Sequence, residues 1–195
     1  SFSSFHPGRE RWLIAVDTGG TFIDAWAIDP QGRELRRKLL SSSTLRSTAT
    51  SVEGATITLA GNWGTASDFF AGFTAGTRRG RGSGNGAKVI GWEAATCTLT
   101  LESIVEVEVG DTVELSSSEE APVLAARLLT GTPLGTEFPP MELRLSTTRA
   151  TNALLEHKGA RVAFFTTEGF GDLLEIGDQR RPDLFALEHH KPPSL

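Results

Sequence analysis

One short stretch, residues 13–24, most constrains how this chain can fold. Leu13 to Val16 is a continuous apolar run, which is typical of a strand buried on both faces. The run ends at Asp17, two glycines follow, and a second apolar run begins and ends at Asp24. Because paired glycines between two apolar runs are a tight-turn signal, this stretch predicts a β-hairpin.

The turn of this hairpin carries groups that can bind phosphate. Glycine has no Cβ, so backbone N–H groups at Gly19 and Gly20 can approach an anion closely. Thr18 and Thr21 add hydroxyl donors, and Asp17, where the first strand ends, is well placed to hold a hydrated Mg²⁺. A glycine pair can also serve turn geometry alone, but the full set of residues favours a phosphate-binding hairpin.

The composition fits an ordinary globular chain and disfavours several classes of protein. With 195 residues, of which 38% are hydrophobic and 22% charged, we expect one domain or one domain with an insertion. A net charge of -5 gives no reason to expect nucleic acid or an anionic membrane as a partner. The single cysteine, Cys97, excludes an internal disulfide framework and fits a cytoplasmic location. No apolar run approaches the ~20 residues of a membrane span.

The first part of the chain predicts a lobe that is interrupted by a β-rich insertion. Residues 1–11 are polar and are expected to be a flexible lead-in. Residues 25–29 would complete the second strand of the hairpin, and a third antiparallel strand at 34–40 would make a three-stranded meander. Between 44 and 118, apolar and polar residues alternate and glycine-rich turns intervene, so we expect a small antiparallel barrel or sandwich. Four basic residues surround a glycine-rich loop there, which we interpret as a solvated hairpin tip, with an anion-binding or docking patch as the alternative: Arg78, Arg79, Arg81 and Lys88.

After residue 118 the pattern changes to alternating helices and strands. Acidic residues before Pro122 predict the start of a helix that Gly131 ends. The expected elements that follow are a strand at 141–146, a helix at 148–159, a buried strand at 161–166 and a short helix at 170–176. They form an α/β half with a parallel pair of strands joined by a right-handed crossover. We therefore assign residues 12–43 and 119–195 to one lobe and 44–118 to an insertion.

Two resemblances add to this interpretation. The hairpin resembles the first phosphate loop of actin-like, sugar-kinase-type ATPases, which have a ribonuclease-H-like fold. Further blocks, in order along the chain, resemble the amino-terminal region of the 5-oxoprolinase and hydantoinase A family: residues 17–24, 36–41, 147–156, 158–163, 166–170 and 175–185. The resemblance covers residues 12–41 and 119–195 but not the insertion. Three residues depart from the family pattern: Ile23, Ser146 and Arg149. We expect Ile23 to face the core, whereas Arg149 lies among the candidate substrate contacts and leaves the exact substrate open.

The resemblance implies an α/β, ribonuclease-H-like first lobe of an ATP-dependent 5-oxoprolinase, which hydrolyses 5-oxo-L-proline to L-glutamate with ATP cleavage. It implies ATP and Mg²⁺ as cofactors. The ATP phosphates would be bound by Thr18, Gly19, Gly20 and Thr21, while Asp17 would be catalytic and hold Mg²⁺ through water. Asp24 is a candidate to orient the Asp17 carboxylate, or a structural residue that caps the neighbouring strand.

A second group of candidate residues lies where a strand meets a helix. The hydroxyls and polar side chains at this position could bind a carboxylate or a phosphate, or could serve ordinary helix capping. The residues are Thr147, Thr148, Arg149 and Asn152.

Several other functions stay open at this point. A hydantoinase of the N-methylhydantoinase type and an acetone carboxylase-like subunit are alternatives within the family, and a non-catalytic lobe that carries a β interaction module is another. A sugar kinase fits less well, because many such kinases have a cysteine-rich zinc motif that this chain lacks. We expect a small cyclic amide as substrate and the remainder of the same enzyme, or a second subunit, as partner. Since nucleotide lies between two lobes in this superfamily, the chain alone is expected to be inactive.

Overall fold

The computed structural model describes residues 10–61, 63–77, 86–177 and 185. The chain divides into two compact units, residues 1–149 and residues 150–195, and each is described by itself. The expected lead-in at residues 1–9, and Arg78, Arg79 and Arg81 of the basic loop, lie outside the described residues. None of the helices in the described part has the length and apolarity needed to cross a lipid bilayer.

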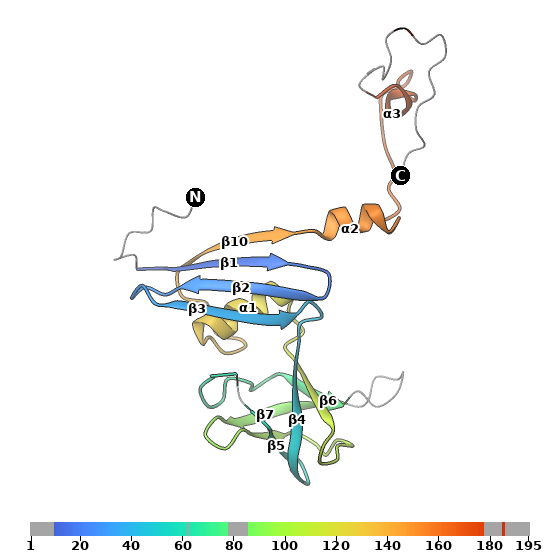
Figure 1. The fold of residues 1–195 in the computed structure, drawn as a ribbon. Coiled ribbons are helices and arrows are strands. Elements are labelled where there is room, and N and C mark those ends of the chain that lie inside the picture. Colours follow the sequence, from blue (N-terminus) through green and yellow to red (C-terminus); the bar gives the residue numbers. More distant parts are fainter. Residues whose placement is uncertain (1–9, 62, 78–85, 178–184, 186–195) are drawn as a thin grey trace. The chain divides into compact units, whose positions relative to one another are not determined.

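A four-stranded sheet forms the first layer of the larger unit (Figure 1). Its strands are β1 (Trp12–Thr18), β2 (Phe22–Ile28), β3 (Glu34–Leu40) and β10 (Met141–Thr147), in the order β10-β1-β2-β3. The first three strands form an antiparallel meander, and β10 lies parallel to β1. The predicted hairpin is therefore present, and the carboxyl ends of β1 and β10 meet at one edge of the sheet.

Helix α1 (Ala121–Thr130) covers one face of this sheet (Figure 1). Pro122 lies in its first turn and Gly131 ends it in the left-handed conformation at φ 69°, donating its N–H to the Arg127 carbonyl. Leu124 of the helix is fully buried, as is Ile23 of β2, which confirms that Ile23 faces the core. The predicted start and end signals of this helix are both confirmed.

Asp29 holds the turn between β2 and β3. Its carboxylate accepts hydrogen bonds from the backbone N–H groups of Gln31 and Arg33 at 2.9 and 2.8 Å and from the Arg33 guanidinium at 2.6 Å. Burial of the side chain raises its pKa, but these hydrogen bonds and the charge of Arg33 outweigh burial, so the pKa of Asp29 lies below its ordinary value. The end of the meander far from the glycine pair is thereby fixed.

The stretch between β3 and α1 forms a closed barrel of short antiparallel strands. The strands are β4 (Thr44–Glu53), β5 (Thr56–Leu59), β6 (Thr74–Thr77), β7 (Ala87–Glu93), β8 (Thr98–Leu101) and β9 (Thr112–Ser116), in the closed order β4-β5-β8-β7-β6-β9. Closure leaves no exposed sheet edge, and the alternating pattern of the sequence follows from one face of each strand pointing inward.

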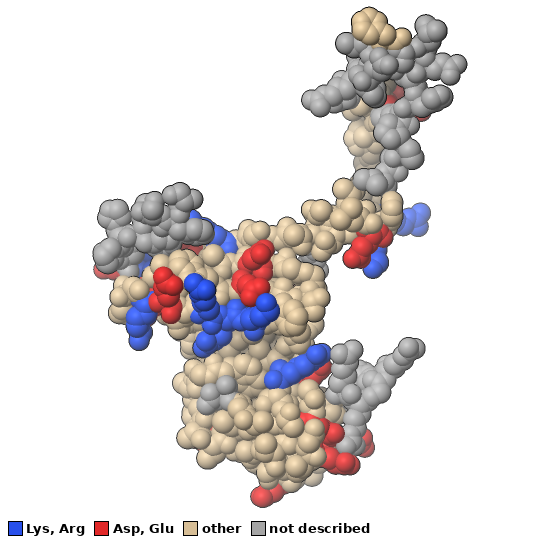
Figure 2. Space-filling model, in the orientation of Figure 1, with Lys and Arg blue, Asp and Glu red and all other residues tan. Residues whose placement is uncertain are grey.

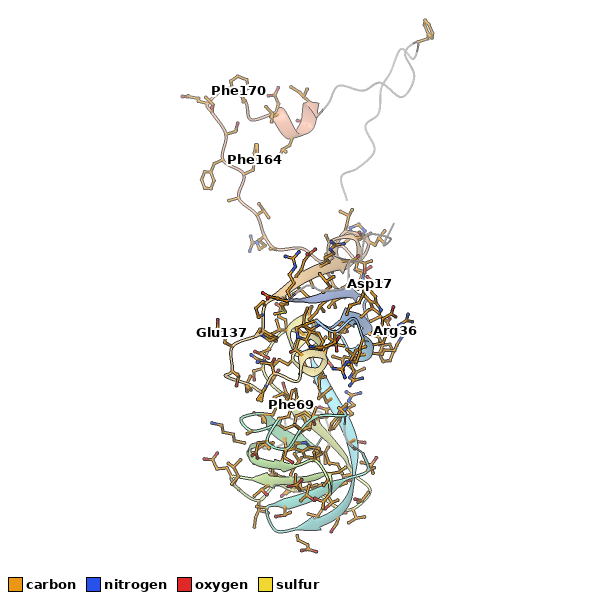
Figure 3. The ribbon with its side chains drawn as sticks, turned by 90° about the vertical axis from the view of Figure 1, so that its left-hand side faces the viewer. Asp17, Arg36, Phe69, Glu137, Phe164 and Phe170 are labelled. Carbon is orange, nitrogen blue, oxygen red and sulfur yellow. The ribbon has the colours of Figure 1, made fainter. Side chains whose placement is uncertain are left out.

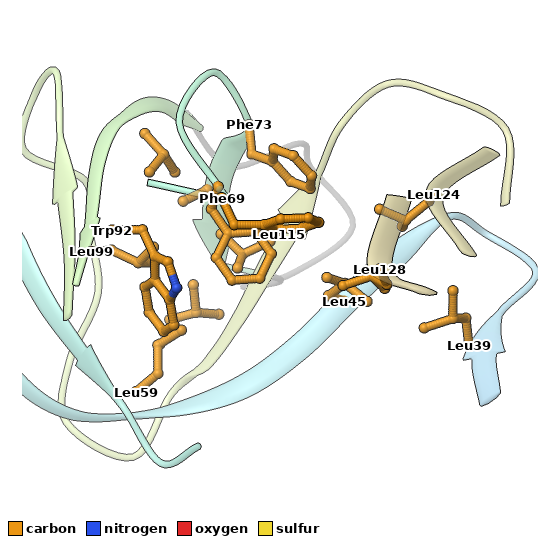
Figure 4. Close-up of a cluster of buried hydrophobic side chains, with 14 of the residues drawn as sticks. Leu39, Leu45, Leu59, Phe69, Phe73, Trp92, Leu99, Leu115, Leu124 and Leu128 are labelled. Atoms are coloured by element: carbon orange, nitrogen blue, oxygen red, sulfur yellow. The ribbon is translucent and has the colours of Figure 1, made fainter. Parts of the chain in front are cut away.

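Aromatic side chains fill the barrel interior. The ring of Phe70 is fully buried and lies 5.0 to 5.2 Å from the rings of Trp63, Phe69, Phe73 and Trp92, nearly perpendicular to each. Edge-to-face packing of this kind adds to the free energy gained by burying the rings. The buried residues of the barrel, the sheet and α1 belong to one hydrophobic cluster, part of which is drawn in Figure 4.

Two sequence predictions for the second half of the chain are wrong. Helix α2 (Arg149–Leu155) ends four residues before the predicted end at Gly159, and His157 takes a positive φ of 52° that stops the helical turn. Residues 161–166 are not a buried strand: they have no regular secondary structure, are exposed and pair with none of the described strands. Phe164 and Phe170 accordingly stand exposed (Figure 3), and α3 (Leu173–Ile176) is the remaining helix described in that unit. A strand requires a partner for its backbone groups, and periodicity alone does not supply one.

Candidate functional site

The loop of the β1–β2 hairpin consists of Gly19, Gly20 and Thr21. The Gly19 N–H donates a hydrogen bond to the Phe22 carbonyl at 3.0 Å, which closes the loop. A Cβ added at Gly19 would lie 3.0 Å from the same carbonyl oxygen, closer than side chains normally approach a backbone atom. A side chain at this position would require the Phe22 carbonyl to shift by a few tenths of an ångström, so the loop disfavours residues larger than glycine here.

Ser41, which follows β3, holds the loop from the side. Its hydroxyl donates a hydrogen bond to the Gly20 carbonyl at 2.7 Å, and its N–H donates to the Thr21 carbonyl at 2.9 Å. The sequence analysis gave Ser41 no role. The usable signal is its register, because the residue after the third strand of a meander lies opposite the turn that precedes the second strand.

The loop presents several donors that the protein itself does not use. Within the described part of the chain, the backbone N–H groups of Gly20 and Thr21 donate no hydrogen bond. The hydroxyls of Thr18 and Thr21 are likewise without a partner among those residues, and Gly20 and Thr21 are exposed. Unpaired amides at a glycine turn, beside free hydroxyls, are a donor set that suits phosphate oxygens.

Asp17 stands at the end of β1, next to this loop (Figure 3). It is exposed rather than sealed in the core, and its cross-strand neighbours are Asp24 on β2 and Ser146 on β10. No described residue forms an ion pair or side-chain hydrogen bond with its carboxylate. The carboxylate is therefore accessible to a ligand in solution.

Asp24 is already engaged by a cation of the protein. Its carboxylate oxygens lie 3.3 and 3.4 Å from Lys38 Nζ, which also sits 5.3 Å from the centre of the Phe22 ring. Both residues of this ion pair are exposed, so it contributes little to stability. The contact supports the structural interpretation of Asp24, although its position beside Asp17 is compatible with the orienting role.

A magnesium ion at this edge of the sheet would have few protein ligands. Across the described ranges there is no group of three or more His, Cys, Asp or Glu residues that could hold a metal ion. Mg²⁺ usually keeps several waters and binds through one or two carboxylates together with substrate phosphates. The accessible Asp17 carboxylate beside a phosphate-type loop, with the neighbouring Asp24 already paired to Lys38, fits that coordination and does not fit a metal held by the protein alone.

The fold brings part of the second candidate group to the hairpin. In the parallel β1–β10 pair, Thr147 is in register with Thr18, and the Thr148 N–H donates to the Thr18 carbonyl at 3.4 Å. Ser146 is in register with Asp17. Two groups of residues whose register partners are 129 positions apart in the sequence therefore lie at the same end of the sheet, as the parallel register places them.

The remaining two residues of that group are not placed at the hairpin. Asn152 belongs to the second unit, and the side chain of Arg149 lies outside the described part of the chain. Helix α2, which begins at Arg149, has only seven residues. A helix this short gives no support for an anion site at its amino terminus.

The exposed face of β2 and β3 holds a separate open hollow of about 770 Å³. Its lining includes Trp26, Glu34, Arg36 and Lys38, and acidic and basic side chains lie next to one another there (Figure 2). Asp24 is part of its lining, but the glycine loop does not contribute to it. The lining has two acidic residues, Asp24 and Glu34, and three basic ones, Arg36, Arg37 and Lys38, so it carries a small excess of positive charge that is mostly offset by its own carboxylates.

Comparison with known proteins identifies the family. A family model described as the hydantoinase/oxoprolinase N-terminal region matches residues 99–194. The chain belongs to the hydantoinase/oxoprolinase family. The match includes β10 with Thr147 and Thr148, and it leaves out residues 1–98 with the hairpin, so the interpretation of the hairpin depends on its own geometry.

The curated relatives of this hydantoinase/oxoprolinase chain include proteins named 5-oxoprolinase. The chain is 44% identical over 92 residues to 5-oxoprolinase 1 of Arabidopsis thaliana, which is 43% of this chain and 7% of that protein. It is 59% identical over 49 residues to the 5-oxoprolinase of Saccharomyces cerevisiae, which is 25% of this chain and 4% of that protein. The chain thus spans less than a tenth of the length of these relatives. No solved structure matches it.

Proposed function

We propose that this chain is the first-lobe region of an ATP-dependent cyclic amide hydrolase that opens 5-oxo-L-proline to L-glutamate with cleavage of ATP. The relatives named 5-oxoprolinase support the choice of substrate. The observation that carries the ATP-binding part is the hairpin loop with the end of β1, where the unused N–H groups of Gly20 and Thr21 and the exposed carboxylate of Asp17 lie close together along the chain.

The chemistry of the reaction explains why such a loop is needed. Hydrolysis of a five-membered lactam is unfavourable without coupling. Transfer of the ATP γ-phosphoryl group to the amide oxygen, with ADP as the leaving group, activates the ring carbon for attack by water. The ring C–N bond then breaks, its nitrogen takes up a proton, and a second water hydrolyses the resulting acyl phosphate to the carboxylate and phosphate. Phosphoryl transfer requires positioning and charge neutralisation more than covalent help from the protein. In this proposal Gly20 and Thr21 bind phosphate oxygens through their N–H groups, Thr18 adds its hydroxyl, and Asp17 orients a water of the Mg²⁺ shell.

The sheet supports a ribonuclease-H-like, actin-type lobe as part of the proposal. An antiparallel three-stranded meander followed, after a helix, by a strand parallel to β1 is the order in which that fold begins. In such ATPases the nucleotide lies between two lobes. The chain by itself is therefore proposed to bind MgATP weakly and to hydrolyse none, with the second half of the site on another part of the enzyme or on a second subunit in the cytoplasm.

An assay of the complete natural protein that contains this chain tests the proposal. Release of phosphate and of glutamate is measured with ATP and 5-oxo-L-proline, and the same assay is run with hydantoin, N-methylhydantoin and acetone as competing substrates. Equal release of phosphate and glutamate is expected with 5-oxo-L-proline, and Asp17→Asn should abolish most of it, while Asp24→Asn should have a smaller effect. Absence of ATP-dependent turnover with any cyclic amide would refute the proposal.

A hydantoinase is the second candidate, because the matching family model covers hydantoinases and oxoprolinases alike. Ring opening of a hydantoin needs the same activation of a cyclic amide. Preferential turnover of a hydantoin in the assay above would favour this candidate and leave the role of the hairpin unchanged.

A further inference from the structure

Ser41 makes more contacts to the hairpin loop than its place in the sequence suggests. We propose that Ser41 is a positioning residue that aims the Thr21 amide of the loop at the nucleotide phosphates, an inference that rests on the proposed ATP-binding function. Its hydroxyl and its N–H each hold one loop carbonyl, that of Gly20 at 2.7 Å and that of Thr21 at 2.9 Å. Two consecutive peptide groups of the loop are thereby fixed by a single residue.

Because the peptide bond is planar, the contacts of Ser41 also determine the direction of the Thr21 N–H. In a trans peptide the C=O of one residue and the N–H of the next point in opposite directions within one plane. The carbonyl of Gly20 points to the Ser41 hydroxyl, so the N–H of Thr21 is directed away from Ser41. This N–H is one of the two loop amides that make no hydrogen bond within the described residues, so Ser41 sets its direction without occupying it.

The hydroxyl of Ser41 is not needed by its own turn. The turn after β3 is closed by the Ser43 N–H, which donates to the Leu40 carbonyl at 3.1 Å. The Ser43 hydroxyl binds the Glu119 carbonyl and so ties the start of the barrel to the start of α1. Of these two serines, only Ser41 directs its side chain to the hairpin, across 21 positions of the sequence.

The neighbouring residue provides a matched control. Ser42 is exposed, and its hydroxyl has no partner within the described ranges, while its carbonyl accepts a hydrogen bond from the Thr44 hydroxyl that an alanine would keep. Ser42→Ala removes a hydroxyl from the same turn without touching the loop. Ser41→Thr keeps the hydroxyl at position 41 and tests whether the group itself is responsible.

The experiment compares Ser41→Ala, Ser41→Thr and Ser42→Ala with the unchanged complete protein. Calorimetric titration with a magnesium complex of a non-hydrolysable ATP analogue, and separately with adenosine, measures binding. Loss of one intramolecular hydrogen bond from the loop is expected to weaken binding of the ATP analogue by about three- to tenfold in Ser41→Ala. Adenosine binding should be unchanged, and the other two variants should stay close to the unchanged protein. Without nucleotide, hydrogen exchange of the peptide that contains Thr21 should speed up in Ser41→Ala alone.

The possible outcomes distinguish a failure of the Ser41 inference from a failure of the proposed ATP-binding function. If the unchanged protein binds the ATP analogue but Ser41→Ala matches Ser42→Ala in binding and in exchange, Ser41 is not a positioning residue. Equal losses for the ATP analogue and for adenosine would also overturn the inference, because they indicate general damage to the fold. If the unchanged protein itself does not bind the analogue, the proposed ATP-binding function fails and the inference fails with it.

Discussion

Replacement of Gly19 by alanine tests whether the shape of the hairpin loop matters for nucleotide binding. The added Cβ would lie 3.0 Å from the Phe22 carbonyl oxygen. That oxygen is a backbone atom, and it already accepts the Gly19 N–H at 3.0 Å, so the shift of a few tenths of an ångström that the Cβ requires would strain the hydrogen bond that closes the loop. Forcing an extra carbon into a filled space typically costs about 1–3 kcal/mol.

This cost converts into a measurable loss of affinity. If the whole cost falls on the binding-competent shape of the loop, Gly19→Ala weakens binding of the magnesium–ATP complex by about five- to 150-fold. Calorimetric titration of the complete protein measures this change. Gly61→Ala is the matched control, because a Cβ added at Gly61 has no described atom within 4 Å and its backbone is not left-handed.

The two glycine variants are expected to differ in nucleotide binding. Gly61→Ala should bind the nucleotide as the unchanged protein does, whereas Gly19→Ala should bind it weakly while the protein remains folded by circular dichroism. If Gly19→Ala binds the nucleotide within a factor of about two of the unchanged protein, the loop is not a phosphate cradle, since that difference is below half a kcal/mol.

Two further predictions concern the scaffold. Phe70→Ala should lower the free energy of unfolding, measured by urea titration, by about 3–5 kcal/mol, because it empties a fully buried aromatic site. Ile90→Ala is the control: this side chain is 58% exposed, so its loss should change the free energy of unfolding by about 0.5 kcal/mol or less. Equal effects would show that the barrel core is not packed as described. Asp29→Asn should reduce the melting temperature at pH 7, and the gap to the unchanged protein should narrow as the pH falls. The pKa of Asp29 is lowered in the folded state, so its stabilising contribution is present above the unfolded pKa of about 4 and is lost as the pH drops through the folded value. A difference in melting temperature that stays constant or widens in acid would contradict the conclusion that the Arg33 contacts stabilise the ionised Asp29 carboxylate.

Local patterns in the sequence were enough to predict the elements that depend on local chemistry. The hairpin follows from an apolar run and two glycines, and the end of α1 follows from Gly131, which takes the left-handed conformation that a helix terminus favours. The strand at 34–40 has the predicted bounds. Alternation of polar and apolar residues likewise marks strands that form the barrel, although it does not distinguish a barrel from a sandwich.

Features that depend on distant partners could not be predicted in the same way. Residues 161–166 are as apolar as a buried strand, yet the structure pairs them with none of the described strands, because pairing is decided by what lies beside a segment. The approach of Thr147 to Thr18 required the parallel register of β10 and β1. The contact between Ser41 and Gly20 spans two strands, and no spacing rule for a single strand reveals it.

Our central proposal is that the hairpin loop, residues 19–21, together with Asp17 at the end of β1, holds the phosphates of a nucleotide. A crystal structure of the complete protein with Mg²⁺ and a non-hydrolysable ATP analogue tests it most directly. We predict phosphate oxygens within hydrogen-bonding distance of the Gly20 and Thr21 amides, with the Asp17 carboxylate facing a water bound to the ion. Phosphates bound elsewhere, with the loop amides turned toward protein alone, would contradict the account.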